Sequence, residues 1–308
     1  MSKFKIGMLT REIVNVAGKG LTAGDIAQAM AGPAMAIAIG YALKAPAMVL
    51  FTLPPVGYAA NAMGGAGGPF AVYLVAIFAS EMGKAVSKET KIDLLVTPAA
   101  TLLAGLGIAW LTAAPVGNAA NSLGRLIMWA TELHPLSMGI LVAVLVGMAL
   151  TLPISSAAIC AGLGLTGLAG GAALAGCCAQ MVGFAVMSFR ENRWGGLVSQ
   201  GLGTSMLQMG NILKNPRVWI PPILTSMITG PVATCIFRLE MNGAAVNSGM
   251  GTCGLCGPIG VWTGWTDPGA FDWTGLLLVS FVLPAVICLL IALVFRKMGW
   301  IRPGDLSI

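Results

Sequence analysis

The stretch LHPLSMGILVAVLVGMALTLPISSAAICAGLGLTGLAGGAALAGCCAQMVGFAVMSF, residues 133–189, runs for 57 positions without Asp, Glu, Lys or Arg. A helix needs about 20 apolar residues to cross the hydrocarbon core of a bilayer, so this stretch has room for two or three crossings. Pro153 and the glycine-rich run from Gly162 to Gly176 are positions where the chain can break between helices. The stretch therefore predicts a membrane protein with several spanning helices.

The rest of the chain has the same character. Of its 308 residues, 17 are Lys or Arg, 11 are Asp or Glu, and 57% are hydrophobic. Soluble domains have about a quarter of their residues charged, and disordered chains are polar, so both classes are excluded. Seven further stretches of at least 18 residues lack charged side chains: 26–43, 45–80, 94–124, 194–213, 218–237, 241–266 and 273–295.

Lys and Arg in the short connections predict the orientation, because cytoplasmic loops of membrane proteins are enriched in them. The basic positions expected on the cytoplasmic side are Lys84, Lys88, Lys91, Arg190, Arg193, Lys214, Arg217, Arg296, Lys297 and Arg302. The connection 262–273 carries Asp267 and Asp272 without a base, so it is expected outside. Both termini are then cytoplasmic: residues 1–20 as an amphipathic helix on the headgroups, or alternatively a frayed basic tail, and residues 297–308 as a tail.

The predicted fold is an all-α polytopic membrane protein, with residues 1–308 forming a single integral membrane domain. Eight spans satisfy the charge pattern: 24–43, 69–83, 92–114, 135–153, 157–170, 171–188, 218–238 and 274–296. Segments 45–63, 194–213 and 241–262 are interpreted as re-entrant pieces, and 116–132 as an interfacial amphipathic helix. Broken helix at membrane depth is tolerated where it lines a cavity, and such breaks mark substrate sites in transporters. Close helix packing through small residues is the alternative explanation of the glycine clusters.

Polar side chains at membrane depth are costly and therefore suggest function. Those at this depth are almost all neutral, and they include Thr151, Gln180 and Gln200. The predicted substrate-binding residues are Asn61, Ser155, Ser156, Ser205, Gln208, Asn211, Asn247, Ser248 and Thr252. Amides, hydroxyls and loop N–H groups suit a polar neutral solute or a small anion.

No catalytic residue, metal site or cofactor is predicted. Cys253 and Cys256 have the spacing of a metal or redox pair, but no second pair at that spacing exists and cysteine in hydrocarbon acts as a small hydrophobe. The sole histidine, His134, precedes a proline that can start a helix. Nucleic acid is not an expected partner, because membrane orientation accounts for the net charge of +6.

Several motifs resemble the fructose-type enzyme IIC, the permease subunit of the sugar phosphotransferase system. They are KIDLLVTP (91–98), GMALTLPISSAA (147–158) and GTSMLQMGNILKNP (203–216), the last resembling the family signature G-I-T-E-G-A-I-P-F. Together they cover roughly residues 90–235, and the pattern is similar to the divergent branch that includes toxin-regulator membrane proteins. The resemblance implies a homodimer in the bacterial inner (cytoplasmic) membrane, with an immobile interface domain and a moving solute-carrying domain.

The departures from the family matter for function. Met206 stands where the signature has its glutamate, and Ser155 and Ser156 stand where the family has an Asn-Lys pair. We therefore expect a permease that moves a small polar solute, sugar-like or a small organic anion, by alternating access and without intrinsic enzymatic phosphorylation. Two alternatives remain: a sugar permease subunit served by separate cytoplasmic phosphocarrier proteins, and a membrane ligand sensor.

Overall fold

The computed structural model describes residues 14–16, 19–21, 23–89, 92–265 and 267–308. It divides into two compact units, one up to Asn118 and one from Ala119 to Ile308, with the boundary inside helix α5. Each unit is described by itself. The described residues contain one pair of short antiparallel strands, and the other regular elements of both units are helices, as the sequence predicts.

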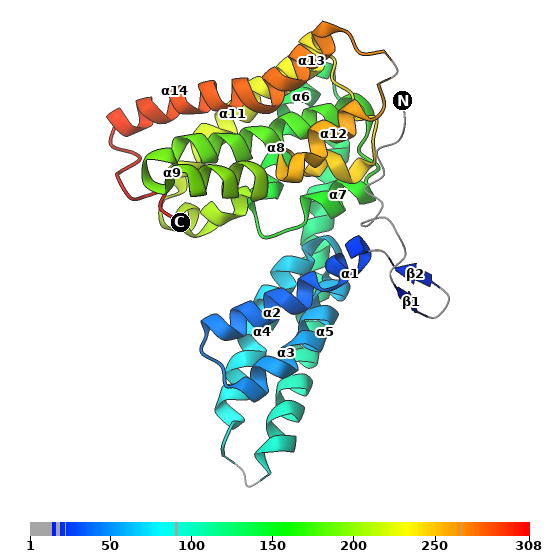
Figure 1. Ribbon diagram of the computed structural model, residues 1–308, viewed down its shortest axis with the longest axis vertical. Coiled ribbons are helices and arrows are strands. Elements are labelled where there is room, and N and C mark those ends of the chain that lie inside the picture. The colour runs from blue at the N-terminus through cyan, green and yellow to red at the C-terminus, as the bar shows by residue number, and fades with distance from the viewer. Residues whose placement is uncertain (1–13, 17–18, 22, 90–91, 266) are drawn as a thin grey trace. The chain divides into compact units, whose positions relative to one another are not determined.

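The first unit is built mainly from helices (Figure 1), and α2 and α3 pack through small residues. Strands β1 (Val14–Val16) and β2 (Lys19–Leu21) pair antiparallel and precede α1 (Ala23–Ala29), α2 (Ala31–Ala42), α3 (Ala47–Gly64), α4 (Gly68–Val86) and α5 (Asp93–Thr131), with the 3-10 turn η1 (Gly65–Gly67) joining α3 to α4. A Cβ placed on Gly32 would lie 2.5 Å from the carbonyl oxygen of Gly57, so α2 and α3 meet backbone to backbone. Around this contact Val49, Leu53 and Val56 form a fully buried core.

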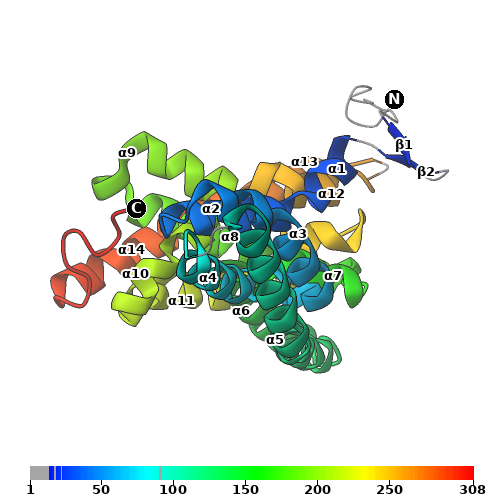
Figure 2. The ribbon, with the colours of Figure 1, turned by 90° about the horizontal axis from the view of Figure 1, so that it is seen from below.

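The second unit surrounds one helix, α8 (Gly167–Met187), which packs against α6 (Pro135–Thr151), α11 (Ile220–Pro231) and α14 (Leu283–Lys297) (Figures 1 and 2). Small residues make this possible, because Gly170, Gly171 and Gly176 bring α8 against neighbouring backbone or side-chain atoms. The remaining elements are α7 (Ser156–Gly162), α9 (Phe189–Val198), η2 (Ser199–Gly203), η3 (Ser205–Gln208), α10 (Met209–Lys214), η4 (Pro216–Trp219), η5 (Val232–Ile236), η6 (Ala245–Gly249), η7 (Cys253–Leu255), α12 (Cys256–Trp262), α13 (Ala270–Leu277) and η8 (Leu278–Val282).

Five helical stretches in the described residues are long and apolar enough to cross a membrane: Ala47–Val86, Asp93–Thr131, Gly167–Met187, Pro216–Ile236 and Ala270–Lys297. The last four overlap the predicted spans 92–114, 171–188, 218–238 and 274–296, and the first contains the predicted span 69–83. Shorter apolar helices occupy Ala31–Ala42, Pro135–Thr151 and Cys253–Trp262. The first two of these take the place of predicted spans 24–43 and 135–153. The protein is thus a multi-pass membrane protein.

Three segment predictions were wrong. Residues 157–170 are not one span, because α7 ends at Gly162 and the positive φ angles of Gly164 and Gly167 turn the chain. Residues 45–63 are not broken, because α3 continues through Pro54 and Pro55. Residues 116–132 are not a separate helix: they continue 92–114 through Pro115 as the 39-residue α5, about 58 Å long at 1.5 Å per residue. A membrane helix can absorb a proline where neighbouring groups re-satisfy the freed backbone.

The other two irregular segments are broken, as predicted. Residues 194–213 contain the π-helix η2, the 3-10 helix η3 and the six-residue α10. Residues 241–262 contain η6 and η7 before α12. The predicted amphipathic helix at residues 1–20 lies mostly outside the described residues, and its described part forms β1 and the start of β2 instead.

Candidate functional site

A cluster of uncharged polar side chains lies inside the second unit, where α6, α8, η3 and η4 meet. Thr151 ends α6, Gln180 lies on α8, Ser205 begins η3 and Trp219 ends η4. The hydroxyls of Thr151 and Ser205 are 2.9 Å apart, and the Thr151 hydroxyl donates to Gln180 Oε1 at 3.2 Å. The Trp219 indole N–H donates to the same Oε1 at 2.9 Å. Thr151, Gln180 and Ser205 are fully buried.

The Gln180 amide nitrogen is the unusual atom of this cluster. Gln180 Nε2 is buried and has no hydrogen-bond partner within the described structure. Its orientation is fixed by chemistry: the indole N–H of Trp219 can only donate, so the amide oxygen and not the nitrogen must face it. A buried donor without a partner costs free energy, roughly 1–3 kcal/mol. Such an atom indicates a place where something else, a solute or a water, accepts a hydrogen bond.

The polar cluster offers both donors and an acceptor. When Thr151 donates to Gln180 Oε1, the shared hydrogen bond with Ser205 must use the Ser205 proton. Ser205 Oγ then keeps a free lone pair, and Gln180 Nε2 keeps two free N–H groups. No member of the cluster is charged. This combination matches a hydroxyl group, which both donates and accepts.

Of the predicted binding residues, only Ser205 belongs to this cluster. Gln208 and Asn211 lie on the next turns of the same broken segment, but protein atoms already satisfy their amide groups. Gln208 Nε2 donates to Gln200 Oε1 and to the Leu306 carbonyl, each at 3.0 Å. Asn211 Nδ2 donates to Gln208 Oε1 at 2.8 Å and to the Ser307 carbonyl at 2.9 Å. In this conformation both residues hold the chain.

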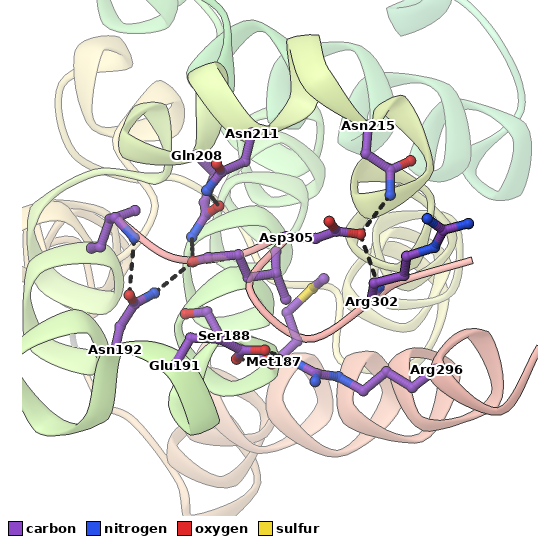
Figure 3. Close-up of polar contacts among 12 residues, drawn as sticks. Met187, Ser188, Glu191, Asn192, Gln208, Asn211, Asn215, Arg296, Arg302 and Asp305 are labelled. Carbon is purple, nitrogen blue, oxygen red and sulfur yellow. Dashed lines mark hydrogen bonds and ion pairs between the residues drawn. The ribbon is translucent and has the colours of Figure 1, made fainter. Parts of the chain in front are cut away.

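These contacts belong to a larger set of amides that hold residues 299–308, called here the 299–308 segment (Figure 3). Asn192 Nδ2 donates to the Leu306 carbonyl at 2.7 Å, and its Oδ1 accepts from the Ile308 N–H at 3.0 Å. Asn215 Nδ2 donates to the Trp300 carbonyl at 3.0 Å and to Asp305 Oδ2 at 2.8 Å. The segment is therefore fixed against α9, α10 and η4 by side-chain amides.

The hydroxyls of the second broken segment also bond to the backbone. Ser156 donates to the Gly249 carbonyl at 2.8 Å, Ser248 donates to the Leu165 carbonyl at 2.6 Å, and Thr252 donates to the Gly201 carbonyl. These bonds connect η6 to α7 and to the turn that follows α7, and they connect the residue before η7 to η2. Ser155 accepts from the Ala158 N–H at 3.1 Å and caps α7. The three buried hydroxyls thus secure irregular backbone, which must be satisfied at membrane depth.

The last two predicted residues lie apart from these contacts. Asn247 is half-buried in η6, beside Gly243 and Gly260. Asn61 is in the first unit, on α3, where it borders a shallow pocket with Gln28 and Tyr58. The structure therefore distributes the nine predicted residues over several environments.

Sequence reasoning counted Thr151 and Gln180 among the polar groups at membrane depth but did not select them, and it missed Trp219. The available signal was Gln180 itself, because it is the one side-chain amide in the 21-residue helix α8. Of the 18-residue apolar stretch of this helix, 94% is buried. Trp219 carries no such signal, since an aromatic residue beside Pro221 and Pro222 is common at the start of a membrane helix.

Metal chemistry finds no support in the described residues, where no group of three or more His, Cys, Asp or Glu side chains is positioned to hold an ion. All seven cysteines are free thiols. Burial raises the pKa of the Cys160 thiol to about 12, so it stays protonated at neutral pH. This fits a cysteine that packs and does not react.

Comparison with known proteins gives one match. The family model described as "Phosphotransferase system, EIIC" matches residues 2–308. No curated protein and no solved structure matches the chain.

Proposed function

Because the chain belongs to the phosphotransferase system EIIC family, whose members are membrane sugar-permease components, we propose that it carries a small hydroxylated solute through the polar cluster of its second unit. The proposed ligands are Gln180, Ser205 and Thr151, with Trp219 bordering the site. The family match over residues 2–308 supports treating the two compact units as one membrane domain. We place it in the bacterial cytoplasmic membrane, as a homodimer.

The observation that carries the proposal is the amide nitrogen of Gln180, which is buried and has no hydrogen-bond partner in the described structure. Of the two solute classes that the sequence leaves open, the cluster favours the neutral one, because no Lys or Arg belongs to it and a buried anion without a cation is costly. A sugar or polyol hydroxyl can accept from Gln180 Nε2 and donate to Ser205 Oγ. The indole of Trp219 adds the flat apolar surface on which sugar C–H groups pack.

Alternating access is the proposed mechanism, and the broken segment supports it. Ser205 is carried by η3, between the π-helix η2 and the six-residue α10. Irregular helix of this kind can change its backbone angles at lower cost than an intact helix, and in transporters it accompanies midplane binding sites. Phosphorylation by the chain alone is not proposed, because the polar cluster contains no general base that could activate a hydroxyl.

The first test is ligand binding to purified protein. We expect at least one member of a panel of monosaccharides, polyols and sugar acids to raise the melting temperature of the detergent-purified protein, because a ligand of the folded state stabilises it. Gln180→Met and Ser205→Ala should each weaken that solute about tenfold or more, corresponding to one lost hydrogen bond in a buried site. The matched control is Thr225→Val, which removes a buried hydroxyl outside the cluster that donates to the Pro221 carbonyl of its own helix.

The stability of the unliganded variants separates binding from folding. Gln180→Met removes a donor that has no partner but also the acceptor of two hydrogen bonds, so its unliganded melting temperature is compared with that of Thr225→Val before a loss of affinity is assigned to the site. Unchanged affinity in both Gln180→Met and Ser205→Ala would refute the site. Uptake of the same solute into proteoliposomes without phosphocarrier proteins supports transport by the chain alone, whereas accumulation of phosphorylated solute only with those proteins supports the coupled alternative.

A further inference from the structure

A groove of about 470 Å³ lies in the second unit between the end of α8, α9 and the last turns of α14. Its walls are mainly apolar and include Val186, Leu197, Leu289 and Leu293. Its polar members are the guanidinium groups of Arg190 and Arg296. The polar cluster of Gln180 is not part of this groove.

The α14 side of the groove belongs to a surface that faces lipid. The stretch Ala270–Lys297 is the most apolar of the five candidate spans, and only 28% of its apolar window is buried within the protein. Leu289 and Leu293 are both exposed, at 40% and 38%. Exposed leucines on a spanning helix lie against acyl chains, so the groove opens toward hydrocarbon.

The opposite end of the groove has the features of a membrane–water interface. Trp194 borders the groove, is 71% exposed and meets Phe189 edge to face at 5.3 Å between ring centroids. Tryptophan is enriched where hydrocarbon meets headgroups. Arg296 and Lys297 are the basic residues in the last turn of α14, and Arg296 lines the groove together with Trp194. The groove therefore runs from an apolar side to a cationic, interfacial one.

One cation of the groove has its charge uncompensated. Arg296 pairs with Glu191 at 2.9 Å and donates to the Met187 carbonyl at 3.0 Å. Glu191 therefore compensates the charge of Arg296 and not that of Arg190. Within the described part of the chain the Arg190 side chain is exposed and has no hydrogen-bond or carboxylate partner. An unpaired guanidinium beside an apolar groove favours an anionic group attached to a hydrocarbon chain.

We propose that this groove binds an anionic phospholipid, with the phosphate on Arg190 and an acyl chain along Leu289 and Leu293. The lining favours this occupant over a peptide helix, because a phospholipid carries a phosphate and a long hydrocarbon chain in one molecule. A zwitterionic lipid would fill the same apolar walls, but its own cation would compete with Arg190 for the phosphate. The bound lipid would connect α9, which precedes the broken segment, to the spanning helix α14.

The test uses delipidated protein in detergent, with dioleoyl phosphatidylglycerol, dioleoyl phosphatidylcholine or sn-glycerol 3-phosphate added. We expect phosphatidylglycerol to raise the melting temperature and to stay bound in native mass spectrometry, with at least tenfold higher apparent affinity than phosphatidylcholine. Arg190→Gln should remove that preference. Arg193→Gln is the matched control, because it removes the same charge from a nearby exposed residue that does not line the groove.

A second variant tests the acyl-chain side. Leu293→Gln should weaken binding of phosphatidylglycerol and phosphatidylcholine alike, because it places an amide on the apolar wall. Equal stabilisation by both lipids, or the same loss in Arg190→Gln and Arg193→Gln, would overturn the proposal. Stabilisation by glycerol phosphate as strong as that by phosphatidylglycerol would also overturn it, since it would identify a simple anion site.

Discussion

Gly176→Ala should strongly destabilise the folded protein, because the added methyl group has no space between α8 and α6. A Cβ at Gly176 would overlap the carbonyl oxygen of Ala143 on α6, which is backbone and cannot rotate away. Overpacking of this kind costs about 3 kcal/mol, roughly a hundredfold in the ratio of folded to unfolded protein. The measurement is the yield of monodisperse protein in detergent and its thermal unfolding midpoint.

Gly162→Ala is the matched control. Gly162 ends α7, lies in the same glycine-rich run of sequence and has open space where a Cβ would be. Alanine there should fold at least as well as the wild type, because alanine has the higher helix propensity. Equal yields and melting temperatures for Gly176→Ala and Gly162→Ala would mean that α6 and α8 do not meet at this distance.

The glycines of residues 162–176 illustrate what the sequence can and cannot predict. Close packing through small residues accounts for three of them: Gly176 brings α8 against α6, while Gly170 and Gly171 bring α8 against Met241 and Leu239. Gly164 and Gly167 serve the turn between α7 and α8 instead. Composition cannot separate these roles, because each depends on whether another backbone lies opposite. For the same reason the sequence predicts a span at 157–170, where the structure has a short helix and a turn.

Proline alone does not break these helices. The sequence predicts a re-entrant piece at 45–63 and a separate helix at 116–132, yet α3 continues through Pro54 and Pro55 and α5 continues through Pro115. A proline removes one hydrogen bond, and whether the helix breaks depends on what packs around it. The interruptions predicted within 194–213 and 241–262 are confirmed. There the chain has both glycine and polar side chains that can satisfy the freed backbone, such as Thr252, which donates to the Gly201 carbonyl.

The candidate site was only partly predictable. A buried amide on an apolar helix can be found by reading the sequence, and Gln180 is such a residue. The partners of Gln208 and Asn211 could not be found in this way, because they are main-chain carbonyls about 100 residues later in the chain, at Leu306 and Ser307. A carbonyl has no sequence signature. The sequence therefore cannot distinguish these amides from Gln180. The amides of Gln208 and Asn211 bind backbone carbonyls, whereas the amide nitrogen of Gln180 has no partner in the described structure.

The amides that hold the 299–308 segment lead to the second large effect, which concerns Leu306. This side chain is fully buried in a cluster with Phe184, Met187 and Val218, while Ile308, two residues later, is 51% exposed. Leu306→Asp would either bury a carboxylate without a cation or release the segment, and in both cases the burial of a leucine is lost. We expect a loss of about 3–5 kcal/mol, measured as a lower melting temperature.

Release of the 299–308 segment should also weaken solute binding at the proposed site, because that segment helps to position η3. Freed from the Leu306 and Ser307 carbonyls, Gln208 and Asn211 lose two of the bonds that position η3 and α10, and Ser205 begins that same η3. Leu306→Asp should therefore weaken solute binding and raise protease cleavage within residues 199–215. Ile308→Asp adds the same charge at an exposed position of the same segment and should leave both unchanged. Equal melting temperatures for the two variants would show that the segment does not support the fold, and reduced stability with unaltered solute affinity would show that η3 is positioned without it.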